Sequence, residues 1–277
     1  MITEFITYLR HIRGYSWNTC NSYEKDLRHF ARWMRAHDKD ARWSTIDRDD
    51  LDEYVTWQSQ QGLTPATTNR RLSAISSLYD YLKRDGRVEH NPTRYESRRK
   101  IGERIPNTIP MEVLQKAYAM TYGSIHIMLG ILINTGIRIH ELLEIKKHDI
   151  DFNGKSIRIH GKGQTERIVY LPVNVMEEVK TYSQYQQANS TLFGACTQRE
   201  VRHGIYNILR PLTDAKQLSP HAIRHTFATE NAKNGANVTT LALMMGHKNI
   251  KTTQKYIDMT QHNINQAFTT YQQHITQ

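Results

Sequence analysis

Apolar residues at helical spacing constrain the first ninety residues of this 277-residue chain more than any other feature. Phe5, Leu9 and Ile12 form the first apolar stripe, and the last stripe begins with Thr64 as N-cap and Pro65 as the first helical residue. Amphipathic stripes of this kind predict a compact all-α domain of four short helices. The stripes fall in residues 5–12, 23–34, 49–61 and 64–82.

Helical patterns also dominate from Met111 onward, but one β segment interrupts them. Asn153-Gly154 is typical of a two-residue type I′ turn, and Ile157 and Ile159 then alternate with polar residues. A second turn at residues 161–164 leads to a third strand. We expect a mainly α fold in two domains, the second of them a mixed α/β domain with a small three-stranded antiparallel sheet. The expected strands are residues 149–152, 155–160 and 167–171.

Residues 89–110 differ from both halves, because prolines and basic residues replace the apolar stripes. This change predicts a basic linker at residues 89–107, between a first domain at 1–88 and a second domain at 108–277 that ends in a tail helix. Two clusters of polar residues either lie on a solvated surface or contact the phosphates of a nucleic acid. The first cluster is Asn69, Arg70 and Arg71, expected opposite the apolar face of the last helix of the first domain. The second is Arg98, Arg99 and Lys100 in the linker.

The charge balance points to an anionic partner. Lys and Arg number 37 against 27 Asp and Glu, so the net charge is +10, which favours a nucleic acid over a membrane surface. Cys20 and Cys196 are the only cysteines, which argues against a disulfide framework and favours the reducing cytoplasm. The N-terminus has no signal-peptide pattern. The most apolar stretch, residues 125–139, falls short of the ~20 residues that span a membrane, so we expect a buried core helix there.

Arg138 stands in a strongly apolar segment, Thr135-Gly136-Ile137-Arg138. An unpaired buried charge is costly, so this arginine must be paired or must face a ligand. Glu141 follows three residues later on the same helical face and can orient the guanidinium. The alternatives are a buried ion pair and an arginine held ready for a phosphate, which its planar fork binds through two hydrogen bonds.

Ser219-Pro220 predicts the N-cap and first residue of a helix that carries His221 and Arg224 on one face. The free N–H groups at such a helix start bind anions, although a capping histidine and a surface arginine would also explain the pattern. A histidine pair at positions 221 and 225 suggests a metal. However, Ala222 stands where an H-E-x-x-H zinc site has its catalytic glutamate, so we expect no metal.

Tyr256 follows His247 by nine residues. A phenol is a poor nucleophile at its ordinary pKa, and nearby arginine and histidine side chains would lower that pKa by favouring the phenolate. The alternative is ordinary packing of one tyrosine among fifteen. Lys162 lies at a glycine-flanked turn, where it is either solvated or able to donate a proton to a leaving oxygen.

In this order the four segments resemble the catalytic signature of the tyrosine recombinases, the phage-integrase and Xer family. The motifs between Thr135 and Tyr256 are T-G-I-R-x-x-E-L, G-K-G-x-x-x-R-x-V, H-x-x-R-H-T-F-A-T and G-H-x-x-I-x-T-T-x-x-Y. The first half, with R-R-L-S-A-I before the linker, is similar to the small helical, SAM-like core-binding domain of that family. The resemblance therefore implies a DNA-binding domain followed by a tyrosine-recombinase catalytic domain.

The resemblance also implies a role for each matching residue. Tyr256 falls on the nucleophile, Lys162 on the lysine that protonates the leaving 5′-oxygen, and His221 on a histidine that helps to remove or return the tyrosine proton. Arginines supply the positive charge in this family, so neither a metal nor another cofactor is implied. The residues expected to stabilise the anionic transition state are Arg138, Arg224 and His247, with Glu141 as acidic partner of Arg138.

The implied reaction is site-specific recombination through a 3′-phosphotyrosine and a Holliday junction, for integration, excision, inversion or dimer resolution. The implied partners are double-stranded DNA with an inverted-repeat core site, three further protomers in a tetramer on that DNA, and accessory proteins. The alternatives are strand relaxation by a type IB topoisomerase and a catalytically silent DNA-binding protein. Tail residues at near-helical spacing pack either into a neighbouring protomer or onto their own domain; they are Ile264, Phe268, Tyr271 and Ile275.

Overall fold

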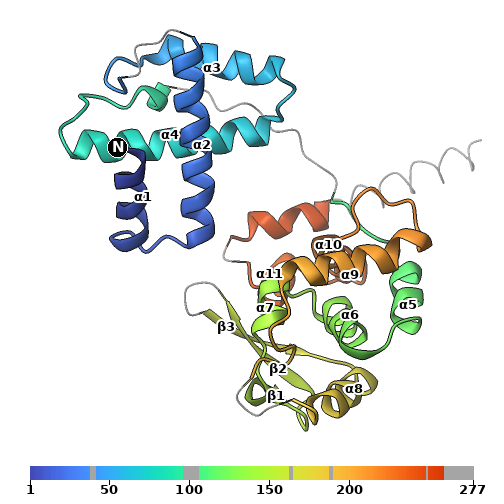
Figure 1. Cartoon of the computed structure of the whole chain (residues 1–277). Coiled ribbons are helices and arrows are strands. Elements are labelled where there is room, and N and C mark those ends of the chain that lie inside the picture. Colours follow the sequence, from blue (N-terminus) through green and yellow to red (C-terminus); the bar gives the residue numbers. More distant parts are fainter. Residues whose placement is uncertain (38–41, 96–105, 162–164, 187–189, 248, 259–277) are drawn as a thin grey trace, which may run out of the picture. The chain divides into compact units, whose positions relative to one another are not determined.

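The structure, a computed structural model, describes residues 1–37, 42–95, 106–161, 165–186, 190–247 and 249–258. The chain divides into two compact units, Met1–Glu103 and Arg104–Gln277 (Figure 1). Within the described ranges, no helix combines the length and the apolar character that crossing a membrane would need.

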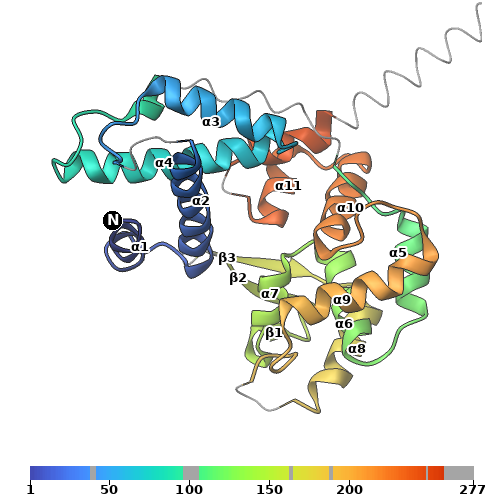
Figure 2. The same ribbon diagram turned by 45° about the horizontal axis from the view of Figure 1, so that its top comes forward.

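Four α-helices form the described part of the first unit, as the apolar stripes predict. Side chains of Ser16, Asp47 and Thr64 cap three of them by accepting a backbone N–H of the first turn. Helix α1 packs beside α2, α2 packs on α4, and α3 runs along α4 (Figure 2). Their bounds are Ile2–His11 for α1, Trp17–Ala36 for α2, Arg48–Gln60 for α3 and Pro65–Arg84 for α4.

The core of this unit is aromatic and aliphatic, with Phe5, Leu27, Phe30 and Tyr54 fully buried. The prediction for Ile12 is wrong, because α1 ends one residue earlier and the Ile12 side chain is 73% exposed.

Part of the expected linker packs on the first unit. The side-chain amide of Asn91 is buried and donates to Ser76 O at 3.0 Å and to Asp80 Oδ1 at 2.8 Å. The short 3-10 helix η1, Pro92–Tyr95, follows directly and contacts α3 and α4. Residues 91–95 of the expected linker therefore pack on the helices of the first unit. The expected bounds of both domains stay a prediction.

Helix α6 is the centre of the second unit. It is apolar all round, from Ile127 to Leu132, which is the pattern of a helix buried on every side. Helices α5, α8, α9 and α10 all contact it (Figure 1). The helices of this unit are α5 Met111–Ala119, α6 Gly123–Thr135, α7 Ile139–Glu144, α8 Val173–Ser183, α9 Gln198–Leu209, α10 Pro220–Lys233 and α11 Val238–Met245, with 3-10 turns η2 Lys147–Asp149 and η3 Arg210–Leu212.

The predicted three-stranded antiparallel sheet is confirmed, in the order β1-β2-β3. Ile157 pairs with Val169 and Ile159 pairs with Arg167, so these four side chains share one face of the sheet. Ile157, Ile159 and Val169 are buried on that face. The strands are β1 Ile150–Asp151, β2 Ser156–Gly161 and β3 Thr165–Tyr170.

The predicted type I′ turn at Asn153-Gly154 is wrong. Asp151 pairs with Ser156, so four residues connect the strands instead of two. The Asp151 carboxylate accepts the backbone N–H groups of Asn153 and Gly154, at 3.1 and 2.9 Å. The left-handed residue is Lys155, with φ 51°. The aspartate side chain thus sets the turn by bonding to the backbone, a preference that the Asn-Gly signal does not include.

Candidate active site

The turn between α6 and α7 places Arg138. Gly136, whose φ of 59° is left-handed, is the C-cap of α6, and Arg138 is the N-cap of α7. A Cβ at position 136 would lie 2.8 Å from Phe227 Cγ on α10. Both the backbone conformation and the close approach of α10 therefore require glycine here.

Glu141 holds two arginines. Its carboxylate accepts from Arg138 Nη1 at 2.9 Å and from the Arg138 backbone N–H at 2.8 Å, as the spacing of three residues predicts. It also accepts from Arg167 Nη1 and Nη2, at 3.0 and 2.8 Å. Burial of the Glu141 side chain by itself raises the pKa of the carboxyl. The hydrogen bonds from Arg167 and Arg138 outweigh that effect and lower the pKa to about 2, so the group stays charged.

The C-terminal end of α11 accepts hydrogen bonds from three arginines. Arg167 Nε donates to Met244 O at 3.0 Å, and Arg224 Nη2 donates to Met245 O at 2.7 Å. Arg138 Nη2 donates to Gly246 O at 3.3 Å. These carbonyls carry the negative end of the helix dipole and have no partner within the helix. The arginines come from the start of α7, from β3 and from α10, so one helix end brings three elements together.

Arg224 is buried, with 3% of its surface exposed. Its guanidinium donates to Gly136 O at 2.6 Å and lies 2.8 Å from His247 Nε2. Burial and the neighbouring Arg138 lower the pKa of Arg224 to about 10, which still leaves it charged at neutral pH. Since a guanidinium only donates, His247 Nε2 accepts, and His247 Nδ1 donates to Thr253 Oγ1 at 2.7 Å. Burial and the charge of Arg224 lower the pKa of His247 to about 4, consistent with this neutral form.

Tyr256 lies in the helical residues 251–258 and is 2% exposed. It packs with Phe227, Leu241 and Met245, and its hydroxyl lies 2.6 Å from His225 Nδ1. Burial raises the pKa of Tyr256 to about 12, although the charge of Arg224 acts in the opposite direction. The expected lowering of the phenol pKa is therefore wrong, because desolvation outweighs the nearby positive charge.

His221 lies at the exposed start of α10, and Ser219 caps this helix as the sequence predicts. The His221 ring is edge-on to the His225 ring, with 4.3 Å between centroids. The hydrogen bond to the Tyr256 hydroxyl is thus made by His225, one turn further along, where the resemblance implied a role for His221. Lys162 and the tail residues Ile264, Phe268, Tyr271 and Ile275 lie outside the described residues.

The candidate DNA-binding residues of the first unit occupy different environments. Arg71 is only 13% exposed and donates to Gln58 Oε1 at 3.0 Å, inside the unit. Arg70 pairs with the buried carboxylate of Asp26 and remains about half exposed. The expectation that these residues lie opposite the apolar face is therefore wrong for Arg71. Asn69 is half-buried, whereas Arg98, Arg99 and Lys100 lie outside the described residues.

Sequence reasoning assigned no role to Arg167 or His225, which both lie at the centre of the site. Arg167 had a detectable signal, because it shares the inward face of its strand with Val169 and a charge on a buried face needs a partner. His225 had a weaker signal, its position one helical turn after His221. No sequence pattern connects it with Tyr256, 31 residues away.

The charges define what the site can bind. Arg138, Arg167 and Arg224 bring three positive charges against the one negative charge of Glu141, and Lys255 adds a further positive charge near the site histidines, so the site is positive overall. Arg138 is the most accessible of the three guanidiniums, with 35% of its side chain exposed. A site of this kind suits a phosphodiester, whose five-coordinate transition state carries two negative charges.

Comparisons with known proteins agree with this chemistry. Residues 110–263 match the family model described as Phage integrase family, and residues 2–86 match Phage integrase, N-terminal SAM-like domain. The chain is 30% identical over 288 residues to Tyrosine recombinase XerD of Oceanobacillus iheyensis, with 98% of this chain and 97% of that protein covered. It is 29% identical to Tyrosine recombinase XerC of Listeria monocytogenes, with 96% and 95% covered.

Solved structures share the fold. The XerH site-specific recombinase in a post-cleavage complex with palindromic difH substrate superposes with a TM-score of 0.79 at 20% identity, covering 98% of this chain and 85% of that chain. The Tn1549 transposon integrase in complex with a circular intermediate DNA gives 0.71 at 17% identity, covering 96% and 98%. On the family models and the nearly full-length relatives, this chain belongs to the phage integrase family, the tyrosine recombinases.

Proposed function

We propose that the chain cuts and rejoins DNA at specific sites through Tyr256. The phenol oxygen attacks a phosphodiester, forms a 3′-phosphotyrosine and releases a 5′-hydroxyl. The observation that carries this proposal is the excess of positive charge around Arg138 and Arg224, because it can stabilise the negative charge of the transition state. Arg224 also lies close enough to Tyr256 to act on its pKa.

The other family positions complete the proposed mechanism. Arg138, Arg224 and His247 stabilise the five-coordinate transition state. Glu141 holds the Arg138 guanidinium in place through its hydrogen bond to Nη1. His221 sits at the N-terminal turn of α10, where backbone N–H groups add to the attraction for an anion. Lys162 protonates the leaving 5′-oxygen. The phosphotyrosine retains the energy of the original bond, so rejoining by a 5′-hydroxyl needs no nucleotide cofactor.

Rejoining to a partner duplex gives recombination, and rejoining to the same strand gives only relaxation. The similarity to recombinases over nearly the whole chain favours recombination over the topoisomerase reaction. We propose that four protomers hold two duplexes and exchange strands through a Holliday junction, with the C-terminal tail in contact with a neighbouring protomer. DNA with an inverted-repeat core is the proposed substrate.

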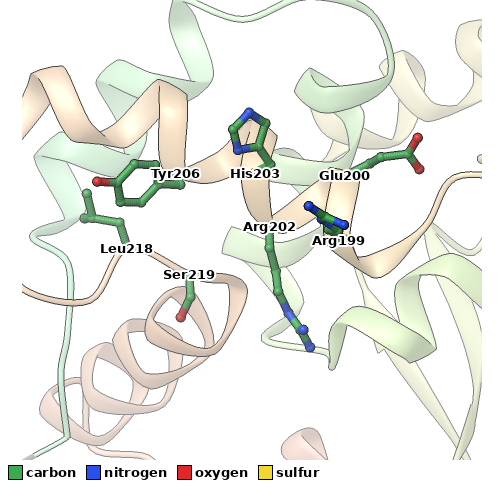
Figure 3. A pocket seen from close by; sticks show the side chains of 7 residues that line it. All are labelled: Arg199, Glu200, Arg202, His203, Tyr206, Leu218 and Ser219. Carbon is green, nitrogen blue, oxygen red and sulfur yellow. The ribbon is translucent and has the colours of Figure 1, made fainter.

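Helix α9 offers a surface for that DNA. Arg199, Arg202 and Tyr206 are exposed on α9 and line an open pocket with Ser219, two residues before His221 (Figure 3). Arginine forks and a tyrosine hydroxyl bind phosphates and base edges alike. Two arginines against the single carboxylate of Glu200 leave this lining positive, as a DNA-contacting surface requires.

A nicked substrate tests the assignment of Tyr256. A duplex is first selected from a random-sequence pool by binding to the full chain, and a nick is placed a few nucleotides 3′ of the cleavage point. The short fragment with the 5′-hydroxyl then diffuses away, so the covalent adduct accumulates. We expect an adduct on the 3′ end of the cut strand with the wild type and with Tyr185→Phe, a control at an exposed tyrosine of the same unit.

Tyr256→Phe should bind the same duplex and give no adduct. An adduct with Tyr256→Phe would disprove the assignment. A wild type that relaxes supercoiled plasmids without joining two duplexes would favour the topoisomerase reaction.

A further inference from the structure

The hydroxyl of Tyr256 has a histidine partner that the family motif does not assign. His225 Nδ1 lies 2.6 Å from Tyr256 Oη, a short and direct hydrogen bond. His225 sits on α10 directly after Arg224, and its ring is partly buried beside the exposed His221. The reacting oxygen thus contacts an imidazole on a helix that Arg224 anchors through its hydrogen bonds to Gly136 O and Met245 O.

The surroundings keep His225 neutral and therefore able to accept a proton. Burial lowers the pKa of His225 to about 3, and the charges that add to this effect face it from two elements besides its own helix. Tyr256 keeps its own proton, since burial raises its pKa to about 12. A neutral phenol donates to a neutral imidazole nitrogen, which places the ring proton of His225 on Nε2. The charged and titratable groups facing His225 are His221 and Arg224 on α10, His247 after α11, and Lys255 and Tyr256 in residues 251–258.

The other histidines of the site are less suited to this task. Both ring nitrogens of His247 are engaged, Nε2 with Arg224 and Nδ1 with Thr253. The contact described for His221 is with the His225 ring. His225 is therefore the histidine whose nitrogen already meets the proton that has to leave.

We propose that His225 Nδ1 accepts the hydroxyl proton of Tyr256 as the phenol oxygen attacks the scissile phosphate, and returns it during rejoining. This inference rests on the proposed function of Tyr256. In the forward step the Oη–H bond breaks, Oη–P forms and P–O5′ breaks. The proton moves to His225, and the leaving 5′-oxygen takes a proton from a separate donor, for which Lys162 is proposed. Attack by a 5′-hydroxyl reverses each change.

Binding of DNA makes this transfer easier. The phosphodiester brings a negative charge to the guanidiniums, which offsets the positive field of Arg224 and Lys255 on the imidazole. The basicity of His225 therefore rises when substrate is present, which couples loss of the Tyr256 proton to DNA binding.

Single-turnover cleavage of the nicked duplex tests the proposal with His225→Ala and His225→Asn. A positioned general base contributes roughly 10²–10⁴ in rate, so we expect both variants to cleave that much more slowly at pH 7.5 with unchanged DNA affinity. Asparagine can hold the hydroxyl but cannot take its proton, so it should not restore the rate. Between pH 7.5 and 9.5 the rate of both variants should rise about tenfold per pH unit, because hydroxide replaces the base, and the wild type should stay nearly flat.

Added imidazole gives a second measurement that a purely structural role would not change. It should accelerate His225→Ala in proportion to the neutral fraction of the imidazole. Lys233→Ala, at the exposed far end of α10, is the control for a disturbed helix.

Two results would overturn the proposal. Either variant could cleave at the wild-type rate, or both variants could be slow with a flat pH profile and no response to imidazole. Failure of the proposed function itself has a different signature, since the wild type would then form no adduct that depends on Tyr256.

Discussion

Replacement of Glu141 by glutamine should lower the free energy of unfolding of the second unit and leave that of the first unit unchanged. The Glu141 side chain is fully buried and accepts four hydrogen bonds from Arg138 and Arg167, two on each carboxylate oxygen. Glutamine has the same shape but only one oxygen. In either orientation of the amide, two N–H donors then face an NH₂ group, and the guanidiniums of Arg138 and Arg167 lose their counter-charge.

Two independent arguments give the size of the effect. Removing one partner of a buried ion pair costs about 3–5 kcal/mol. The pKa of Glu141 falls from 4.5 to about 2, and at ~1.4 kcal/mol per pKa unit this shift corresponds to about 3 kcal/mol. We therefore expect Glu141→Gln to lower the free energy of unfolding by about 3 kcal/mol. A carboxyl with a lowered pKa stabilises above its unfolded pKa, so the loss should be constant from pH 6 to 8 and should shrink below pH 4.5.

The distribution of tryptophan makes the assay specific. Trp17, Trp33, Trp43 and Trp57 are the only tryptophans, and all lie in the first unit. Urea unfolding followed by fluorescence therefore reports the first unit, and far-ultraviolet circular dichroism reports both. Glu141→Gln should shift only the part of the dichroism transition that fluorescence does not follow.

Glu144→Gln, at the exposed end of the same short helix, is the matched control and should shift neither signal. Cleavage of the nicked duplex should fall in parallel, since Arg138 loses its orientation. The reasoning is refuted if Glu141→Gln unfolds within 0.5 kcal/mol of the wild type, the usual range for surface substitutions, and cleaves at the wild-type rate.

Three further predictions follow from the same structure. Gly136→Ala should destabilise the protein by about 2–4 kcal/mol in the dichroism assay, from the left-handed backbone and the overlap with Phe227, whereas Gly235→Ala, also left-handed but in open space, should lose only about 1 kcal/mol. The pKa values of His225 and His247 lie below 6.5, so the unfolded chain binds protons at a higher pH than the folded chain does. The free energy of unfolding should therefore fall as the pH is lowered from 6.5 to 4, by up to ~1.4 kcal/mol per pH unit for each histidine. A thermal melting temperature that does not change with pH would contradict this. Removing both arginines on α9 that line the pocket of Figure 3, at positions 199 and 202, should weaken DNA binding and lower the slope of log affinity against log salt by about 2, with Lys180→Ala on α8 as control.

Local patterns in the sequence predicted most of the helices and the sheet, because periodicity and capping act within a few residues. Thr64 and Ser219 cap the helices that their positions suggested. The prediction of a type I′ turn was wrong for a local reason as well. The Asp151 carboxylate accepts the backbone N–H groups of Asn153 and Gly154, and the Asn-Gly pattern does not consider such a side-chain acceptor. Adding side-chain acceptors to turn patterns would have corrected it.

Long-range partners explain the remaining differences. Arg71 turns inward because Gln58 on another helix accepts its hydrogen bond and the buried Asp26 lies nearby. The pairing of His225 with Tyr256 joins α10 to a segment beyond α11. Such contacts depend on how helices pack, which no spacing within one helix contains. Arg167 on β3 lies between these two cases. The alternation along the strand predicts that its side chain faces inward, but nothing in the sequence predicts that Glu141 is its partner.

The C-terminal end of α11 links the integrity of the site to the folding of eight residues. A helix of that length is not stable in isolation, so α11 exists only while it is packed. If α11 unwinds, the guanidiniums of Arg138, Arg167 and Arg224 lose their carbonyl acceptors together. The segment that carries Tyr256 follows α11 directly in the chain, so it loses its anchor in the same step. Charge and nucleophile are therefore assembled or dismantled as one cooperative event. A half-formed centre, with the phosphate clamp in place and the tyrosine free to react elsewhere, is disfavoured by this architecture.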